Sequence, residues 1–256
     1  GEAFSSPEVV LVYSEEGLGE MSRIYHRLYR NRLCRGKWKN KERPILVNNW
    51  EATYFDFDEK KILDIAKKAK EIGIDLLVLD DGWFGKRNID KCSLGDWSVN
   101  YKKLPHGIDG LAKKINDIGL KFGLWFEPEM VSPDSNLYRN HPDWCIHVKG
   151  RERSEERWQL ILDLSRDDVC EYIINAVNGV IKSANIEYVK WDMNRNMTEP
   201  GSETLGSERQ CELYHRYILG LYKILDKIVS DNPDILFESC SGGGGRFDPG
   251  MLYYMP

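Results

Sequence analysis

Seven carboxylic acids in this 256-residue sequence follow closely after short apolar runs, and in chain order they are Asp80, Asp81, Glu127, Glu129, Asp163, Asp192 and Glu238. Carboxylates can act as nucleophiles, as general acids or bases, and as acceptors for hydroxyl groups. Tryptophans accompany them, namely Trp50, Trp83, Trp125 and Trp191. Carboxylates accept hydrogen bonds from sugar hydroxyls, aromatic rings cover the apolar face of a pyranose, and glycoside hydrolysis needs two carboxyl groups. The first hypothesis is therefore a carbohydrate pocket.

The same acids offer a second chemistry, which is metal binding. Clustered Asp and Glu side chains could hold Mg²⁺ beside a lysine base, as in enolase-type sites, and Lys190 lies two residues before Asp192. The five histidines form no HxH or HExxH spacing, so a zinc site is not expected. The simplest alternative is that each acid only caps a helix or faces solvent, although this explains one acid more easily than all of them.

Six apolar runs of strand-forming residues precede these polar positions, and they span residues 45–47, 76–79, 122–126, 160–162, 186–191 and 235–237. Between them, apolar residues recur at helical spacing over residues 58–72, 111–118, 165–181 and 207–230. Strands that alternate with helices predict a parallel sheet covered by helices. Polar or acidic side chains after every strand favour a (β/α)-barrel, whose active site lies at that end of the strands. A doubly wound open sheet is the alternative, but it would collect its site at one point.

The barrel pattern begins near residue 44 and contains only six strand-like runs, with residues 251–255 as the approach to a seventh. We therefore expect a (β/α)8 TIM-type barrel over residues 44–256, C-terminally truncated after about six strands. Residues 1–43 differ, with a strand-like segment at 9–13 and a basic helix or arm at 25–41. We expect them to be the end of an upstream domain and a linking segment.

The amino-acid composition limits the kinds of partner and the cellular location that we expect for this protein. Lys and Arg number 36 against 41 Asp and Glu, which gives a net charge of −5 and argues against nucleic-acid binding. The apolar runs are too short for a membrane-spanning helix, so no membrane partner is expected. The six cysteines form no CxxC pair. Free thiols in a reducing compartment, and hence a cytoplasmic location, are expected.

Five segments, taken together, indicate the function more specifically than the strand-end acids do. In chain order they are NNWEA (48–52), LDDGWF (79–84), LWFEPEM (124–130), VKWDMN (189–194) and ESCSGGGGRFD (238–248). In type and order they resemble the α-galactosidases of glycoside hydrolase family 36, and the resemblance covers essentially the whole chain. It implies a TIM barrel preceded by a β-sandwich. It also implies retaining hydrolysis of terminal α-galactosides such as melibiose, raffinose and stachyose, without metal or organic cofactor, in a parent protein that forms a homotetramer.

The resemblance also implies roles for individual residues. Asp192 matches the catalytic nucleophile, which would form a covalent galactosyl ester in a double displacement. Asp80 and Asp81 match the pair that binds the axial 4-hydroxyl and the 6-hydroxyl of galactose. Lys190 and Arg157 match sugar-binding cations that also balance those acids. If the resemblance is set aside, the alternative is that these residues are helix caps, counter-ions or solvated charges.

Four further residues match the pocket wall of the family. Trp125 matches an aromatic wall residue and Trp50 matches a residue at the substrate entrance. Cys240 and Gly243 match the small residues near the sugar 2-position. Core packing and tight backbone packing are the alternative explanations. The glycine run 242–245 lacks the ending of a phosphate-binding loop, so close backbone approach to a sugar explains it better.

The family's general acid/base lies just beyond the point where this sequence ends, at Pro256. We therefore expect the chain alone to be a poor catalyst. Three related functions stay open. An α-N-acetylgalactosaminidase would use a similar pocket, a raffinose-synthase-like galactosyltransferase would replace water with a sugar acceptor, and a non-catalytic sugar-binding fragment would bind without turnover.

Overall fold

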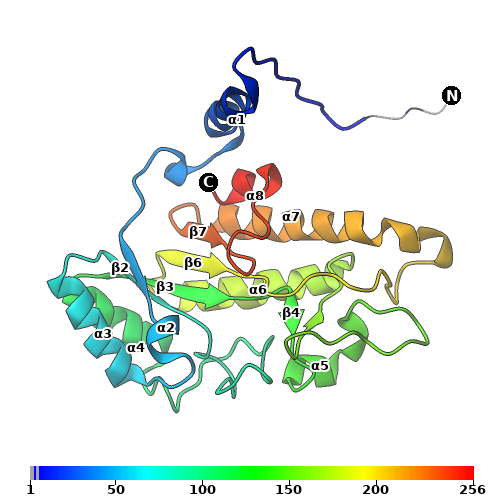
Figure 1. Ribbon diagram of the computed structural model, residues 1–256. Coiled ribbons are helices and arrows are strands. Elements are labelled where there is room, and N and C mark those ends of the chain that lie inside the picture. The colour runs from blue at the N-terminus through cyan, green and yellow to red at the C-terminus, as the bar shows by residue number, and fades with distance from the viewer. Residues whose placement is uncertain (1–2, 4–5) are drawn as a thin grey trace.

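The computed structural model describes residue 3 and residues 6–256. At its centre lies a parallel sheet of five strands in the order β1-β2-β3-β6-β7 (Figure 1). The strands are β1 (Leu46–Asn48), β2 (Leu76–Leu79), β3 (Lys121–Phe126), β6 (Tyr188–Trp191) and β7 (Leu236–Ser239). In the register of the sheet, Val78 pairs with Gly123, and Gly123 pairs with Tyr188. The expected α/β class with a parallel sheet is confirmed.

Four long helices connect the strands, and they are α3 (Glu59–Glu71), α4 (Gly107–Ile118), α6 (Asp167–Ser183) and α7 (Leu213–Asp231). Helix α3 shows how the sequence specifies them. The Asp58 side chain caps it by accepting a hydrogen bond from the backbone N–H of Lys61 at 2.8 Å. Its apolar residues Ile62, Ala66 and Ala69 then fall on one buried face, as their spacing predicts.

These four helices cover only one face of the sheet. Along β2, Leu77 points into the large core that the helices share, whereas Val78 points to the opposite face. There Val78 belongs to a small apolar cluster against which Trp38 packs. A doubly wound sheet would carry helices on both faces, so the chain does not adopt that alternative. One-sided cover is what the wall of a barrel requires.

One expected strand does not join the parallel sheet. Residues Leu160–Ile161 form β5, which pairs antiparallel with β4 (Met130–Val131). Strands β3 and β6 pair directly with each other, so no place is left between them. The parallel sheet therefore contains five of the six expected strands.

Two segments near the chain ends also differ from expectation. Residues 251–255, expected as the approach to a strand, lie largely in helix α8 (Pro249–Tyr254), which the Asp248 side chain caps through the backbone N–H of Met251 at 3.0 Å. Residues 9–13 form no strand. The basic segment, expected as a helix or arm over 25–41, is helical in α1 (Gly17–Leu28), in the π-helical turn η1 (Tyr29–Leu33) and in the short 3₁₀ helix η2 (Lys37–Lys39), so the helical part begins earlier than expected.

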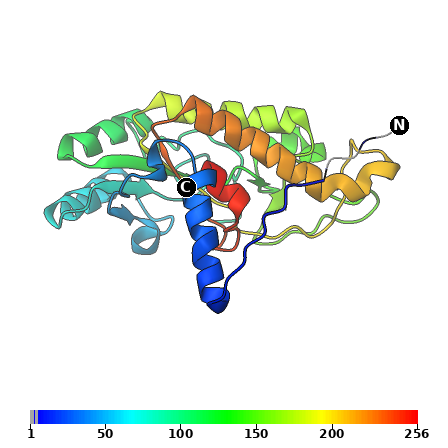
Figure 2. The same ribbon diagram turned by 90° about the horizontal axis from the view of Figure 1, so that it is seen from above.

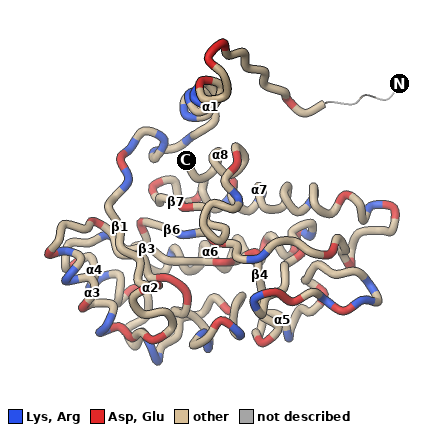
Figure 3. The backbone as a smooth tube through the Cα atoms, in the orientation of Figure 1, with Lys and Arg blue, Asp and Glu red and all other residues tan. Residues whose placement is uncertain are grey.

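Helix α1 has no buried residue and stands apart from the sheet (Figures 1 and 2). Lys and Arg gather on it and on the segment that follows (Figure 3). A domain boundary near residue 44 stays a prediction. The remaining elements are α2 (Trp50–Thr53), α5 (Asn136–Asn140), η3 (Pro142–Trp144) and η4 (Ser207–Glu212). Within the described residues, no helix combines the length and the apolar character needed to cross a bilayer.

Candidate active site

A cavity of about 380 Å³ opens at the carboxyl ends of the parallel strands. The nine residues that the resemblance assigns to the site all line it, and they are Trp50, Asp80, Asp81, Trp125, Arg157, Lys190, Asp192, Cys240 and Gly243. They come from segments far apart in the chain, because parallel strands end at the same edge of the sheet. The structure thus brings the predicted site together, while the role of each residue stays a prediction.

Asp80 and Lys190 form an ion pair on the pocket floor. The Nζ of Lys190 donates to Oδ2 of Asp80 at 2.9 Å, and the side-chain amide of Asn48 donates to the same oxygen. Burial lowers the pKa of Lys190, but the Asp80 carboxylate outweighs it, so the pKa is raised and the lysine stays charged. The backbone N–H of Asp80 donates to Oδ1 of Asn49 at 2.8 Å, which fixes the end of β2.

Asp81 is held by Arg87, a pocket residue that the sequence analysis missed. The guanidinium donates from Nε to Oδ1 at 3.0 Å and from Nη2 to Oδ2 at 2.8 Å, and only 2% of Arg87 is exposed. Burial raises the pKa of Asp81 although Arg87 opposes it. Nothing in the local sequence distinguishes Arg87 from a solvated loop charge. Its proximity to a buried acid is a tertiary feature.

Asp192 lies between two donors. Its Oδ2 accepts a hydrogen bond of 3.0 Å from Nε1 of Trp125, and its Oδ1 accepts one of 3.0 Å from the backbone N–H of Met193. The side chain is 4% exposed and faces the pocket. Cys240 lies beside this carboxylate. Burial and then the charge of Asp192 raise the pKa of the Cys240 thiol to about 11, so the thiol is neutral. A carboxylate held in this way can attack an electrophilic carbon in the pocket.

The carboxyl group of Glu127 lies next to Asp192, at the end of the adjacent strand β3. It accepts hydrogen bonds from Nε2 of Gln159 at 3.0 Å and from the backbone N–H of Asn194. Burial and the neighbouring Asp192 charge raise the pKa of Glu127 to about 8. The Glu127 carboxyl group therefore binds its proton more tightly than an exposed glutamate does. Glu127 is one of the seven acids that follow apolar runs but is not among the residues matched to the family's site, yet it lines the pocket.

Arg157 and Trp50 both line the pocket. Arg157 and Trp158 have φ angles of 52° and 55° and form a two-residue turn, since Glu156 and Gln159 pair across it. Positive φ at two bulky residues is rare, and such strain is found at functional sites. Trp50 begins α2, and its ring packs edge-on against Phe55 at 5.0 Å between centroids. Both positions agree with contact to a bound ligand.

The other strand-end acids lie outside the pocket lining. Glu129 is fully buried and binds Arg246 through two hydrogen bonds of 2.9 and 2.8 Å. Burial acts to raise the pKa of Glu129, but Arg246 and other donors outweigh it and lower the pKa. Asp163 accepts from Oγ of Ser165 at 2.6 Å, and Glu238 accepts from the Tyr188 hydroxyl. Asp163 and Glu238 are thus bound by neighbouring side chains and do not line the pocket.

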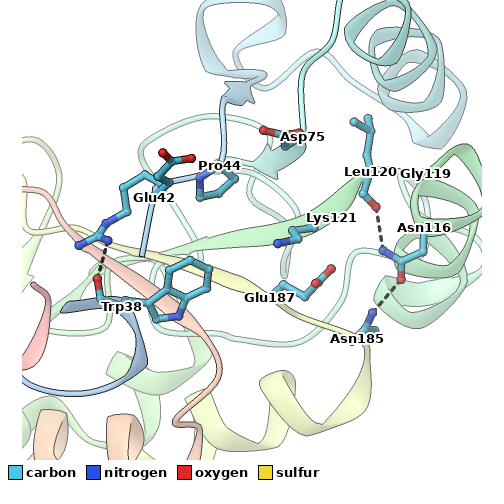
Figure 4. Close-up of a pocket in the computed structure, with 11 residues that line it drawn as sticks. Trp38, Glu42, Pro44, Asp75, Asn116, Gly119, Leu120, Lys121, Asn185 and Glu187 are labelled. Carbon is cyan, nitrogen blue, oxygen red and sulfur yellow. Dashed lines mark hydrogen bonds between the residues drawn. The ribbon is translucent and has the colours of Figure 1, made fainter. Parts of the chain in front are cut away.

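A larger cavity, of about 610 Å³, lies at the opposite end of the strands (Figure 4). Asp75, Lys121 and Glu187 line it, at the amino ends of β2, β3 and β6. It contains none of the predicted site residues. Among residue 3 and residues 6–256, no three His, Cys, Asp or Glu side chains are grouped so that they could hold a metal ion.

Comparison with known proteins shows the family to which the chain is related. The family model described as Melibiase matches residues 3–256. Alpha-galactosidase AgaA from Geobacillus stearothermophilus is 67% identical over 256 residues, which are 100% of this chain and 35% of that protein. The crystal structure of this GH36 alpha-galactosidase superimposes with a TM-score of 0.94, at 67% identity over 96% of this chain and 34% of that one. A variant of AgaA in complex with raffinose gives a TM-score of 0.94 at 66% identity, over the same shares of the two chains.

The chain spans about a third of the length of the curated relatives it matches. Within that span, the resemblance to glycoside hydrolase family 36 is confirmed in sequence and in fold. A match that runs from residue 3 to the last residue shows that this chain belongs to the Melibiase family.

Proposed function

We propose that the protein containing this chain is a retaining α-galactosidase that removes terminal α-linked galactose from oligosaccharides such as melibiose and raffinose. The single observation that carries this proposal is the placement of Asp192. Its carboxylate faces the pocket with both oxygens hydrogen-bonded, close to the Asp80–Lys190 ion pair. The raffinose complex of AgaA, 66% identical over the shared region, supports the substrate class.

The reaction would proceed in two displacements. Asp192 attacks the anomeric carbon, an ester bond forms between its Oδ and that carbon, and the glycosidic oxygen leaves with a proton from a second carboxyl group. Water then attacks the same carbon and releases galactose with retained configuration. The nine predicted site residues do not include this proton donor. Neither step requires a metal or an organic cofactor.

Four further features belong to this proposal. The sheet would be part of a (β/α)8 barrel, and residues 1–43 would link it to an upstream domain. The intact protein would be a homo-oligomer, namely a tetramer. Its substrate would be a small molecule. Its six free cysteines support a reducing compartment such as the cytoplasm.

Covalent labelling tests the proposal. A fluorinated α-galactosyl donor with a dinitrophenyl leaving group needs little protonation, so the ester on Asp192 should accumulate and be found by peptide mass spectrometry. Asp192→Asn should remove the adduct. Asp163→Asn, at a buried acid outside the pocket, should keep it. No adduct on the folded protein, or an adduct elsewhere, would overturn the assignment. Galactose binding without any adduct or turnover would instead favour a sugar-binding function.

A further inference from the structure

The segment after β7 forms one wall of the pocket. Residues 240–246 bring Cys240, Gly242 and Gly243 to the cavity, and we name this segment the glycine loop. Its glycines 242–245 are exposed, and the aromatic residue that follows, Phe247, is 74% exposed. A Cβ atom built on Gly242 or Gly243 would meet no other atom within 4 Å. Hydrogen bonds at the ends of the loop, rather than side-chain packing, must therefore hold it in place.

Glu129 fixes the far end of the loop through Arg246. Besides the two bonds to Arg246, this buried carboxylate accepts from Nε1 of Trp191 at 2.8 Å and from the Tyr217 hydroxyl at 2.6 Å. Four donors from three elements thus meet on one side chain that is 0% exposed. The Arg246 end of the loop is consequently tied to the body of the sheet and to helix α7.

Glu127 fixes the near end through Asn194. Its carboxyl group accepts from the backbone N–H of Asn194, and Oδ1 of Asn194 accepts from the backbone N–H of Gly242 at 3.3 Å. The hydroxyl of Ser241 adds a bond of 2.8 Å to the carbonyl of Met193. Glu127 and Glu129 are two residues apart after β3, so one short segment reaches both ends of the loop.

We propose that Glu127 and Glu129 are positioning residues that hold the glycine loop at its two ends and thereby set the contacts available to the sugar 2-position. This rests on the proposed function. If Asp192 attacks the anomeric carbon, the nearest substituent that does not react is the one on carbon 2. Cys240 lies beside Asp192, so the loop that carries Cys240 and Gly243 is the wall next to that substituent.

A double variant tests the Glu129 arm without leaving a buried charge unpaired. Glu129→Gln with Arg246→Met removes both charges. In the intact protein, kcat/KM for 4-nitrophenyl α-galactoside should fall about 10-fold, because the loop no longer holds the 2-hydroxyl. For the 2-deoxy analogue, which lacks that hydroxyl, the change should stay below about 2-fold. The ratio of the two kcat/KM values is unaffected by partial unfolding of a variant, because the loss of folded protein lowers both values equally.

The matched control is Arg166→Met with Asp168→Asn, which removes an Arg–carboxylate pair that neither lines the pocket nor bonds to Glu129 or Arg246. It should lower the melting temperature and leave the substrate ratio unchanged. An equal fall on both substrates in the Glu129/Arg246 variant, or no fall on either, would overturn the inference. A wild-type protein that turns over neither substrate would instead show that the proposed function fails, before any variant is compared.

Discussion

The indole of Trp125 and the carboxylate of Asp192 are joined across two strands by a hydrogen bond of 3.0 Å. The contact follows from the register of the sheet. Trp125 pairs with Lys190, and Asp192 lies two residues further on, so its side chain points to the same face. With Met193 on the other oxygen, the plane of the carboxylate is fixed. The carboxylate of Asp192, the proposed nucleophile, is thus oriented by the strands themselves.

Trp125→Phe should therefore slow the formation of the covalent adduct. The variant keeps an aromatic ring and removes the donor. A hydrogen bond to a charged group contributes about 1.5–3 kcal/mol, which corresponds to a loss of about 10–100-fold in the labelling rate. Stopped-flow release of dinitrophenol from the fluorosugar measures this step. Trp144→Phe, at a buried tryptophan outside the pocket, should label at the wild-type rate. Equal rates for all three proteins would contradict the assigned role of the indole.

Arg87 should be required for both stability and sugar binding. Arg87→Met leaves Asp81 buried without its partner, and we expect a loss of about 3–5 kcal/mol in the free energy of unfolding. The double variant Arg87→Met/Asp81→Asn removes the unpaired charge and should recover most of that stability. Neither variant should bind galactose in calorimetric titration. Galactose binding by the stable double variant would show that Asp81 does not contact the sugar.

The alternation of strands and loops predicted the acids at the strand ends, whereas the set of nine site residues rests on the resemblance to the family. Every one of the nine predicted residues lines the pocket, since parallel strands place their carboxyl ends at one edge. Arg87 and Gln159 escaped notice because each comes from a loop whose path depends on tertiary contacts. Arg87 reaches Asp81 through such a loop, and the strained turn at Arg157 brings in Gln159.

The predicted fold was wrong in two segments, where the prediction rested on apolar composition alone. Residues 160–162 have a strand sequence, but their partner is β4 in an antiparallel pair, because β3 and β6 already pair with each other. Residues 251–255 look strand-like through their tyrosines. The Asp248 cap and Pro249 start a helix there instead. Strand partners and helix caps involve particular neighbours, which apolar patterning does not encode.

Two glycines in neighbouring helices should respond to alanine in opposite directions. A Cβ on Gly220 in α7 would lie 1.9 Å from the carbonyl oxygen of Leu164, so Gly220→Ala should destabilise the fold by about 1–3 kcal/mol. A Cβ on the exposed Gly179 in α6 meets nothing within 4 Å. Gly179→Ala should stabilise by about 0.5–1 kcal/mol through helix propensity. Urea unfolding measures both, and a stabilising Gly220→Ala would contradict the close approach of α7 to residue 164.

Glu127 should make stability fall as pH rises through about 8. Its pKa is raised from 4.5 to about 8 by burial and by Asp192, with Asp81 adding to the effect and Arg87 opposing it. A raised pKa in the folded state means that the stabilising effect of the bound proton is complete below pH about 4.5 and is lost as pH rises through about 8. Each pKa unit corresponds to about 1.4 kcal/mol. The stability advantage of the wild-type protein over Glu127→Gln should therefore shrink by a few kcal/mol, as an order of magnitude, between pH 5 and pH 9.

Urea unfolding at pH 5, 7 and 9 measures this difference, and Glu129→Gln is the matched control. The pKa of Glu129 is lowered because Arg246 and other donors outweigh its burial, so it stays ionised over this whole range. Its replacement should shift the stability by a constant amount at all three pH values. The Glu127→Gln curve, in contrast, should approach the wild-type curve as pH rises. Parallel curves for wild-type and Glu127→Gln would mean that Glu127 is ionised at neutral pH, and that two full charges lie side by side at the ends of β3 and β6.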